Sequence, residues 1–222
     1  MNNTSDKHLH IVSFDIPYPA NYGGVIDVFF RIKALSQRGV KIHLHCFEYG
    51  REHSAYLESF CHSVTYYKRE TKVAKLFNTL PYIVCSRDSE ELRNNLLKDD
   101  YPILLEGLHC CSILTYDVFK DRNIIVRAHN VEHEYYEHLA MAEVDAKKKV
   151  YLRQEVRKLK DFESILNKAK AILAISQKDY EYFSCRIFRV CNISKPKKVI
   201  FIQRTMLIYR WKISFVFLFK TG

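Results

Sequence analysis

The feature that most constrains the fold is a regular alternation of short apolar runs with helical patterns. Residues 9–15, 40–49, 63–69, 101–109, 123–129 and 171–176 are predicted strands. Helical patterns lie between them, beginning with 25–39, where apolar residues recur on one face. This alternation indicates βαβ units and a mostly parallel sheet covered on both faces. About six units in about 180 residues predict one α/β domain, a Rossmann-like, doubly wound sheet.

The helices in the middle of the chain are less regular. Residues 72–80 and 89–100 have helical patterns, and Pro81 separates them. Residues 111–120 are also predicted to be helical. After the fifth strand, one long helical stretch is expected from about Glu132 to Lys170, because apolar residues recur at helical spacing from Leu152 onward.

The net charge of +10 suggests nucleic-acid binding, but its distribution argues against that function. Residues 1–183 hold 26 Lys/Arg and 25 Asp/Glu, whereas residues 184–222 hold nine Lys/Arg and no acid. The body is therefore balanced, and we expect no nucleic-acid partner. The hydrophobic share of 48%, with only six Gly and five Pro, is that of a globular protein.

Cysteine usage favours a reducing compartment. The chain has seven cysteines, an odd number, and no C-x-x-C pair. Residues 1–15 lack the pattern of a signal peptide, and no stretch of about 20 uncharged apolar residues occurs. We therefore expect a cytoplasmic protein without a spanning helix.

The basic segment needs its own explanation. Residues 185–222 contain no Asp, Glu, Ala or His and keep neither the strand nor the helix period for long. One interpretation is a basic, aromatic segment that lies on an anionic membrane surface. Another is a shifted reading frame, because AT-rich codons read out of frame give this composition. The predicted boundaries are a domain over 8–183 and an aberrant tail over 184–222.

The loop after the first predicted strand carries the first candidate binding residues. It ends in Gly23 and Gly24 at the start of a helix, where backbone N–H groups favour an anion such as phosphate. The alternative is that these glycines only serve the turn. Glu48 stands where a ribose-binding acid of an NAD enzyme would be, but G-x-G-x-x-G is absent, and no P-loop occurs.

Polar residues crowd into 123–138, "NIIVRAHNVEHEYYEH". His129 follows the fifth predicted strand, where ligands of parallel sheets bind, so it is a candidate to contact a sugar hydroxyl or a phosphate. The alternative is a histidine that, with Asn130, caps the next helix. His133 and His138 are five residues apart, on different helix faces, so we expect no metal site.

These residues resemble a known family. "HIVSFDIPYPANYGGVIDVFFRIKALSQRGVKIHLHCF", "VRAHNVEHEYY" and "AKAILAISQKDYEYF" are similar to segments of GT-B fold glycosyltransferases of the family 4 type, also called group 1. The resemblance covers residues 8–183, the N-terminal domain. It implies two Rossmann-like domains across a cleft. The C-terminal domain binds a nucleotide-sugar donor, and the N-terminal domain binds the acceptor.

The resemblance also implies roles for single residues. His129 would touch the transferred sugar as the catalytic residue, and Gly23, Gly24, Asn130 and Ser176 would bind substrate or phosphate. Neither a metal nor a cofactor is expected. The acceptor would be a glycan or a lipid-linked sugar of a surface polysaccharide, with mannosyl or another hexosyl transfer and a peripheral membrane contact. The donor domain is absent from this sequence, so we expect no activity from this chain alone.

Two alternatives of other classes remain open at this point. One is a non-catalytic module that binds an acceptor or a membrane. The other is an NAD-dependent enzyme.

Overall fold

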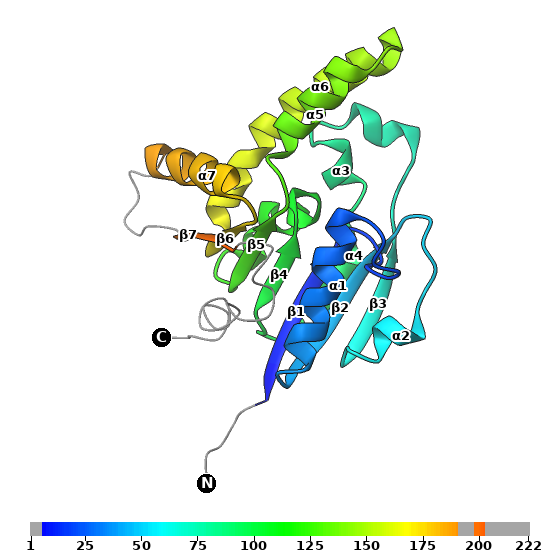
Figure 1. Ribbon diagram of the computed structural model, residues 1–222, viewed down its shortest axis with the longest axis vertical. Coiled ribbons are helices and arrows are strands. Elements are labelled where there is room, and N and C mark those ends of the chain that lie inside the picture. Colours follow the sequence, from blue (N-terminus) through cyan, green and yellow to red (C-terminus); the bar gives the residue numbers. More distant parts are fainter. Residues whose placement is uncertain (1–5, 191–197, 203–222) are drawn as a thin grey trace.

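The computed structural model describes residues 6–190 and 198–202, and it shows one seven-stranded sheet in the order β3-β2-β1-β4-β5-β6-β7 (Figure 1). Every neighbouring pair of strands is parallel. The α/β, Rossmann-like, doubly wound fold predicted from the sequence is confirmed. The strands are β1 (Lys7–Ser13), β2 (Val40–Glu48), β3 (Ser63–Lys68), β4 (Ile103–Glu106), β5 (Ile124–Ala128), β6 (Ala171–Ala174) and β7 (Lys198–Phe201).

The strand order reverses between β1 and β4. The chain moves outward from β1 through β2 to β3, then returns to β4 on the other side of β1. Ligands of open parallel sheets bind outside the carboxyl ends of the strands at such a reversal. The carboxyl edge near β1, β4 and β5 is therefore where a site is expected.

Helices cover both faces of the sheet. On one face, α1 (Gly23–Ser36) packs Val28, Ile32 and Leu35 on alternate residues of the central strands, with α2 (Ala55–Glu58) beside it. The other face is covered by α3 (Tyr82–Cys85), α4 (Glu90–Leu96), the 3-10 helices η2 (Leu108–Thr115) and η3 (Asp117–Phe119), and the end of α6 (Ala146–Phe162). Successive residues of the central strands therefore point alternately into two hydrophobic cores, one on each face of the sheet.

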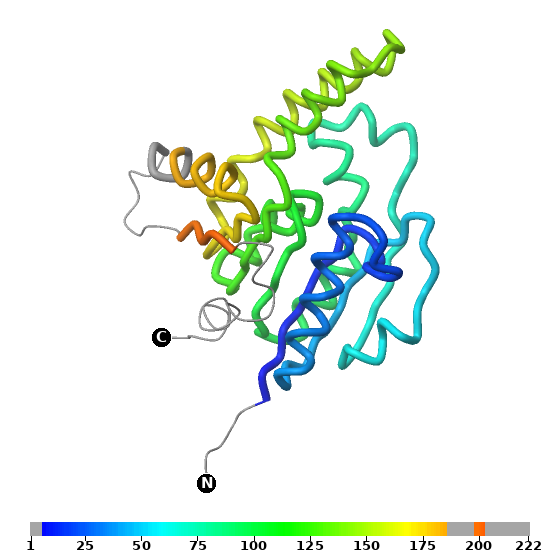
Figure 2. Tube along the Cα trace, in the orientation of Figure 1, coloured from blue at the N-terminus to red at the C-terminus, as the bar shows by residue number. Residues whose placement is uncertain are grey.

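The single helix expected over 132–170 is wrong. The chain forms two helices that run side by side, α5 (Glu132–Ala142) and α6 (Ala146–Phe162), followed by the 3-10 helix η4 (Glu163–Lys168) (Figure 2). The break has a local cause. Asp145 accepts the backbone N–H of Lys148 at 2.8 Å as the N-cap of α6. The Glu143 carboxylate accepts the N–H groups of Val144 and Asp145.

Three further differences concern the middle and the end of the chain. Residues 73–77, 108–115 and 117–119 form 3-10 helices, where helical patterns were predicted over 72–80 and 111–120 and a strand was predicted to reach residue 109. The last helix, α7 (Gln177–Val190), runs past residue 184, and β7 adds a seventh strand from the predicted tail. The boundary at 183 stays a prediction, and residues 203–222 of the tail lie outside the described residues. In the part of the chain that the structure describes, no helix has the length and apolar character to cross a membrane.

Candidate functional site

Gly24 and His129 meet around one aromatic ring at the carboxyl edge. Phe14 directly follows β1, and its ring centre lies 5.6 Å from that of His129. A Cβ atom on Gly24 would lie 2.8 Å from Cζ of the same ring. Glycine at the start of α1 therefore lets the helix approach Phe14. Gly24 and His129 therefore both lie against the Phe14 ring, and the roles of Gly23, Gly24 and His129 stay predictions.

The turn after β4 brings a second histidine to this ring. Gly107 has a φ of +77°, a conformation that favours glycine, and donates its N–H to the Arg127 carbonyl at 2.8 Å. A Cβ atom there would lie 3.0 Å from Nδ1 of His109. The His109 ring centre lies 5.2 Å from that of Phe14. Glycine at 107 therefore allows both histidines to pack at the edge.

A network of buried ion pairs lies next to His129 at the carboxyl edge of the sheet. Arg31 on α1 donates to both Asp27 and Glu106, the last residue of β4. Arg127 on β5 donates to both carboxylate oxygens of Asp27 at 3.2 Å. His129 completes the network through Nε2, which lies 2.9 Å from Oε2 of Glu106. All five side chains are buried.

The charges of this network stabilise one another. Burial alone would raise the pKa of Asp27, but Arg31 and Arg127 hold that pKa well below its ordinary value. Burial likewise opposes ionisation of Glu106, and Arg31 and the His129 hydrogen bond lower its pKa below the usual range. Burial and then the nearby Arg31 lower the pKa of Arg127 to about 10. Two carboxylates therefore face two guanidinium groups, and the histidine adds a hydrogen bond.

The Glu106 carboxylate determines the proton positions on His129. A carboxylate only accepts hydrogen bonds, so Nε2 of His129 carries the proton. In the neutral ring Nδ1 is then an acceptor, and this buried atom has no protein partner. An imidazole oriented in this way can accept a hydrogen bond or a proton from a hydroxyl group, and Glu106 stabilises the cation that would form.

A metal ion does not fit this cluster. One ligand atom from each of Asp27, Glu106 and His129 lies within 4.8 Å of the others, which is close enough for a shared ion. However, Arg31 already donates to both carboxylates, and Arg127 donates to Asp27. A divalent cation would have to displace two buried guanidinium groups, whose charges repel it. The donor set is therefore that of an ion-pair network.

A second acid–histidine pair lies beside the first. Oε1 of Glu132 and Nδ1 of His109 are 3.8 Å apart, both are buried, and neither has a hydrogen-bond partner. Burial raises the pKa of Glu132 to about 7 and holds the pKa of His109 well below its usual range. Arg87 donates to the Phe14 carbonyl at 2.9 Å and so holds the backbone of the residue whose ring both histidines touch. Buried polar atoms without a hydrogen-bond partner are thus concentrated at this edge of the sheet.

Two predicted binding residues have local partners. Asn130 is exposed and does not cap α5, whose N-cap is Val131; its side chain hydrogen-bonds to Glu132. The interpretation of Asn130 as a cap is therefore wrong. The Ser176 hydroxyl donates to Asp179 at 2.6 Å and accepts the Asp179 N–H at 3.0 Å, so it caps α7. Whether either residue binds substrate stays a prediction.

The histidines of the 129–138 stretch go to separate places. His133 is buried with Nδ1 3.4 Å from Oε1 of Glu163, whereas His138 is exposed. Neither contributes to the cluster of His129. Glu48, considered as a ribose-binding acid, accepts a hydrogen bond from exposed His53 at 2.7 Å.

Most of the network has no strong local signature in the sequence. Glu106 is the one acid in the run "ILLE", and Arg127 the one charge in "IIVRA", so each was a polar residue at the end of a buried strand. Asp27 and Arg31 lie one turn apart on the same face as Val28 and Leu35. The available signal was a pair of charged residues on the apolar face of a helix, together with single charged residues at the ends of two buried strands.

Comparison with known sequences gives one curated relative and no family. The chain is 33% identical over 177 residues to an uncharacterized 44.6 kDa protein in the cps region of Klebsiella pneumoniae. The match covers 76% of this chain and 45% of that protein, so the chain spans about half the length of its relative. No family model matches.

Comparison with solved structures shows the fold. The Medicago truncatula protein UGT71G1, complexed with UDP-glucose, superposes with a TM-score of 0.53 at 11% identity, over 91% of this chain and 52% of that one. A UDP-glucosyltransferase from Polygonum tinctorium gives 0.49 at 11% identity, over 89% and 51%. The chain thus has the fold of about half of the Medicago protein. The family 4 type is not identified by these matches and stays a prediction.

Proposed function

We propose that this chain is the acceptor-side half of a GT-B glycosyltransferase, which transfers a sugar from a nucleotide-sugar donor. The observation that carries the proposal is the Glu106–His129 pair at the carboxyl edge of an all-parallel sheet. Nδ1 of His129 has no hydrogen-bond partner in the protein and is available to a ligand, close to the glycines at the start of α1. The fold shared with a protein complexed with UDP-glucose supports the same function.

His129 has the proposed catalytic role. Its bare Nδ1 accepts a hydrogen bond from a sugar hydroxyl, and Glu106 holds the ring in that tautomer. The network behind Glu106 is buried and paired, so the imidazole keeps its orientation without a ligand. Pre-orientation of this kind lowers the entropic cost of positioning a hydroxyl group for reaction. Gly23 and Gly24 keep their proposed role in binding phosphate or acceptor.

The finer assignments are proposals as well. The enzyme would be of the family 4 type, would transfer mannose or another hexose, and would act in the cytoplasm on a glycan or lipid-linked acceptor. The cps region of the curated relative favours a surface polysaccharide as the product. The 222 residues provide one wall of a two-domain cleft. We therefore expect no transfer from UDP-glucose or GDP-mannose by this chain alone.

Saturation-transfer NMR on the purified chain tests the proposal. Neutral mono- and disaccharides, UDP-glucose and GDP-mannose are added in turn. We expect at least one saccharide to bind the wild type and to lose its signal in His129→Asn. The matched control is His138→Asn, an exposed histidine nine residues further on that should leave binding unchanged.

Two results would contradict this function. The first is that no saccharide or nucleotide sugar binds at millimolar concentration. The second is that binding persists unchanged in folded His129→Asn. Turnover of a nucleotide sugar by the chain would refute only the expectation of inactivity. Saccharide binding without transfer, even when the rest of a full-length relative is supplied, would favour the alternative of a non-catalytic acceptor-binding module.

A further inference from the structure

The hairpin of α5 and α6 projects from the body of the molecule (Figure 1). Its far end exposes apolar side chains that nothing in the described chain covers. The exposed fraction is 67% for Met141, 96% for Val144 and 56% for Val150. Single exposed apolar residues are ordinary, but three within ten residues at a projecting turn form a local apolar tip.

A row of cations runs from this tip along α6. Lys149, Arg153, Arg157 and Lys160 follow one another at spacings of four, four and three residues, which places them on one side of a helix. Arg153, Arg157 and Lys160 are exposed. None of these three forms an ion pair among the residues that the structure describes.

Several acidic residues of the hairpin are engaged away from this row; the exposed acids nearest to it are Glu137, which lines the same hollow as Arg153 and Arg157, and Asp161. Glu155 is fully buried on the inner side of α6, where it accepts from Lys158 at 2.9 Å. Glu143 and Asp145 hold the backbone of the turn. The hairpin as a whole, residues 132–162, holds seven Lys/Arg and seven acids, but residues 146–160 of α6 hold all seven cations and a single acid, Glu155. The outer side of α6 is therefore cationic, and the apolar tip lies at its end.

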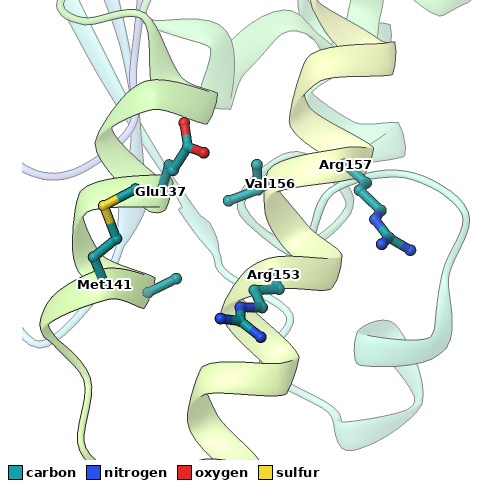
Figure 3. Close-up of a pocket in the computed structure, with 6 residues that line it drawn as sticks. Glu137, Met141, Arg153, Val156 and Arg157 are labelled. Carbon is teal, nitrogen blue, oxygen red and sulfur yellow. The ribbon is translucent and has the colours of Figure 1, made fainter.

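A hollow between the two helices joins the apolar and cationic parts (Figure 3). It has a volume of about 280 Å³. Apolar side chains from both helices form part of its lining, and two guanidinium groups stand on its α6 side. The lining residues are Glu137, Ala140, Met141, Arg153, Val156 and Arg157.

We propose that this surface, the tip of Met141, Val144 and Val150 with the row from Lys149 to Lys160, docks on an anionic phospholipid bilayer. Apolar side chains enter the headgroup region while Lys and Arg contact lipid phosphates, which is how interfacial helices bind. Pairing with a second copy is disfavoured, because two such rows would place like charges opposite each other. Docking does not require the proposed function.

A consequence that does rest on the proposed function concerns the acceptor. α5 begins three residues after His129 and has 11 residues, a length of about 16 Å. Docking through the tip would therefore hold the candidate site within reach of a lipid-linked sugar.

Vesicle sedimentation of the full chain tests the docking surface. Vesicles of phosphatidylcholine with about a third phosphatidylglycerol are compared with pure phosphatidylcholine, at low and high salt. We expect binding only to the anionic vesicles and its loss at high salt. Val144→Asp and the double variant R153Q/R157Q change only exposed positions, so both should fold, which circular dichroism checks.

Matched controls isolate the hairpin. Val118→Asp alters an apolar residue that is 59% exposed on η3, and K120Q/K170Q removes two exposed cations elsewhere. Every variant keeps the nine Lys/Arg of residues 184–222. We expect R153Q/R157Q to weaken binding by about 20-fold and Val144→Asp by about tenfold, with no change in the controls.

Three outcomes would overturn the proposal. One is no sedimentation with anionic vesicles. Another is equal binding by the hairpin variants and the controls, which would assign the contact to the tail. The third is a wild-type dimer that Val144→Asp converts to a monomer without changing vesicle binding, because the tip would then be a self-association surface.

Discussion

Two polar clusters interrupt the apolar cores, one on each face of the sheet. The carboxyl-edge network of Asp27, Arg31, Glu106, Arg127 and His129 lies on the α1 face. The histidine row of His8, His10, His43 and His45 lies in β1 and β2 on the opposite face. Both clusters are buried or partly buried. They differ in whether their hydrogen-bonding groups are all used within the protein.

The buried pair of the histidine row, His10 and His45, is internally satisfied. Nε2 of His10 lies 2.9 Å from Asp99, and its Nδ1 lies 2.9 Å from Nε2 of His45. Nδ1 of His45 lies 2.7 Å from the Tyr67 hydroxyl, which accepts from Asn95 at 2.9 Å. Each group can donate to the next in the order Asn95, Tyr67, His45, His10 and Asp99. Every hydrogen bond then has one donor and one acceptor while the imidazole rings of His10 and His45 are neutral.

The carboxyl-edge network ends differently. Nδ1 of His129 has no protein partner, and nor do Nδ1 of His109 and Oε1 of Glu132. Buried polar groups are normally paired, so groups left open at a sheet's ligand-binding edge indicate a site, whereas a closed chain indicates structure. Both clusters contain histidines, so a buried polar atom without a hydrogen-bond partner is a better indicator of a binding site than the residue type.

Breaking the carboxyl-edge network should have the largest effect on stability. Glu106→Gln removes a carboxylate that Arg31 and His129 both contact, and it leaves two buried guanidinium groups, Arg31 and Arg127, to share the single carboxylate of Asp27. We expect the free energy of unfolding to fall by about 3–5 kcal/mol, measured by urea denaturation. Glu134→Gln breaks the exposed pair with Lys178, which solvent screens, and should cost much less. Equal costs would contradict the role assigned to the network.

Acid should weaken the histidine row before it affects the carboxyl-edge network. Burial lowers the pKa of His45 to about 3 and that of His43 to about 4, and burial also lowers the pKa of His10. The unfolded chain therefore binds more protons than the folded one below pH 6.5, and stability falls as the pH drops toward 4. Asp27 has a lowered pKa, so its contribution is lost only as the pH falls below its unfolded value of 3.8.

A single variant isolates this pH dependence. His45→Gln keeps a donor and an acceptor but cannot titrate. Glu132, whose pKa is raised and which acts in the opposite direction, is common to both proteins and cancels. We expect the stability advantage of the wild type over the variant to shrink by about 1.4 kcal/mol per pH unit from pH 6 to pH 4, in urea denaturation at each pH. A constant difference across that range would show that His45 is not held neutral.

The contrast also shows which parts of the molecule the sequence could predict. Strand-like runs and their alternation with helices depend on local apolar patterns, so the parallel sheet and the position of His129 after β5 were predictable. The shared face of His43 and His45 followed from the period of two. Their partners, His8 and His10, lie 35 residues away, and this pairing depends on the parallel register of β1 and β2.

The missed parts have physical reasons as well. The apolar spacing of α6 continues the pattern of a helix, so the turn at Glu143–Asp145 was hidden although Asp145 is a good N-cap residue. β7 lies in a segment whose composition gave no strand period, and it forms by pairing with β6. The ion network combines α1, β4 and β5, and no local pattern identifies such partners.

Two glycines provide the smallest and most closely matched test. Gly107 and Gly39 have φ of +77° and +76°, but a Cβ atom meets Nδ1 of His109 at 3.0 Å at Gly107 and nothing within 4 Å at Gly39. Gly39→Ala should cost about 1 kcal/mol from backbone strain alone. Gly107→Ala should cost about 1 kcal/mol more by thermal or urea unfolding, because His109 must move. Equal costs would indicate that the edge is loosely packed.

Imidazole nitrogen NMR on histidine-labelled protein distinguishes the two clusters by the protonation of each ring nitrogen. Nδ1 of His129 should be unprotonated and free to bind a ligand, whereas the ring nitrogens of His10 and His45 are all hydrogen-bonded within the protein. We predict that Nδ1 of His129 resonates as an unprotonated nitrogen and shifts when a bound saccharide is added, whereas the nitrogens of His10 and His45 do not change. A protonated Nδ1, or a ligand that shifts the histidine row and leaves His129 unchanged, would contradict the account.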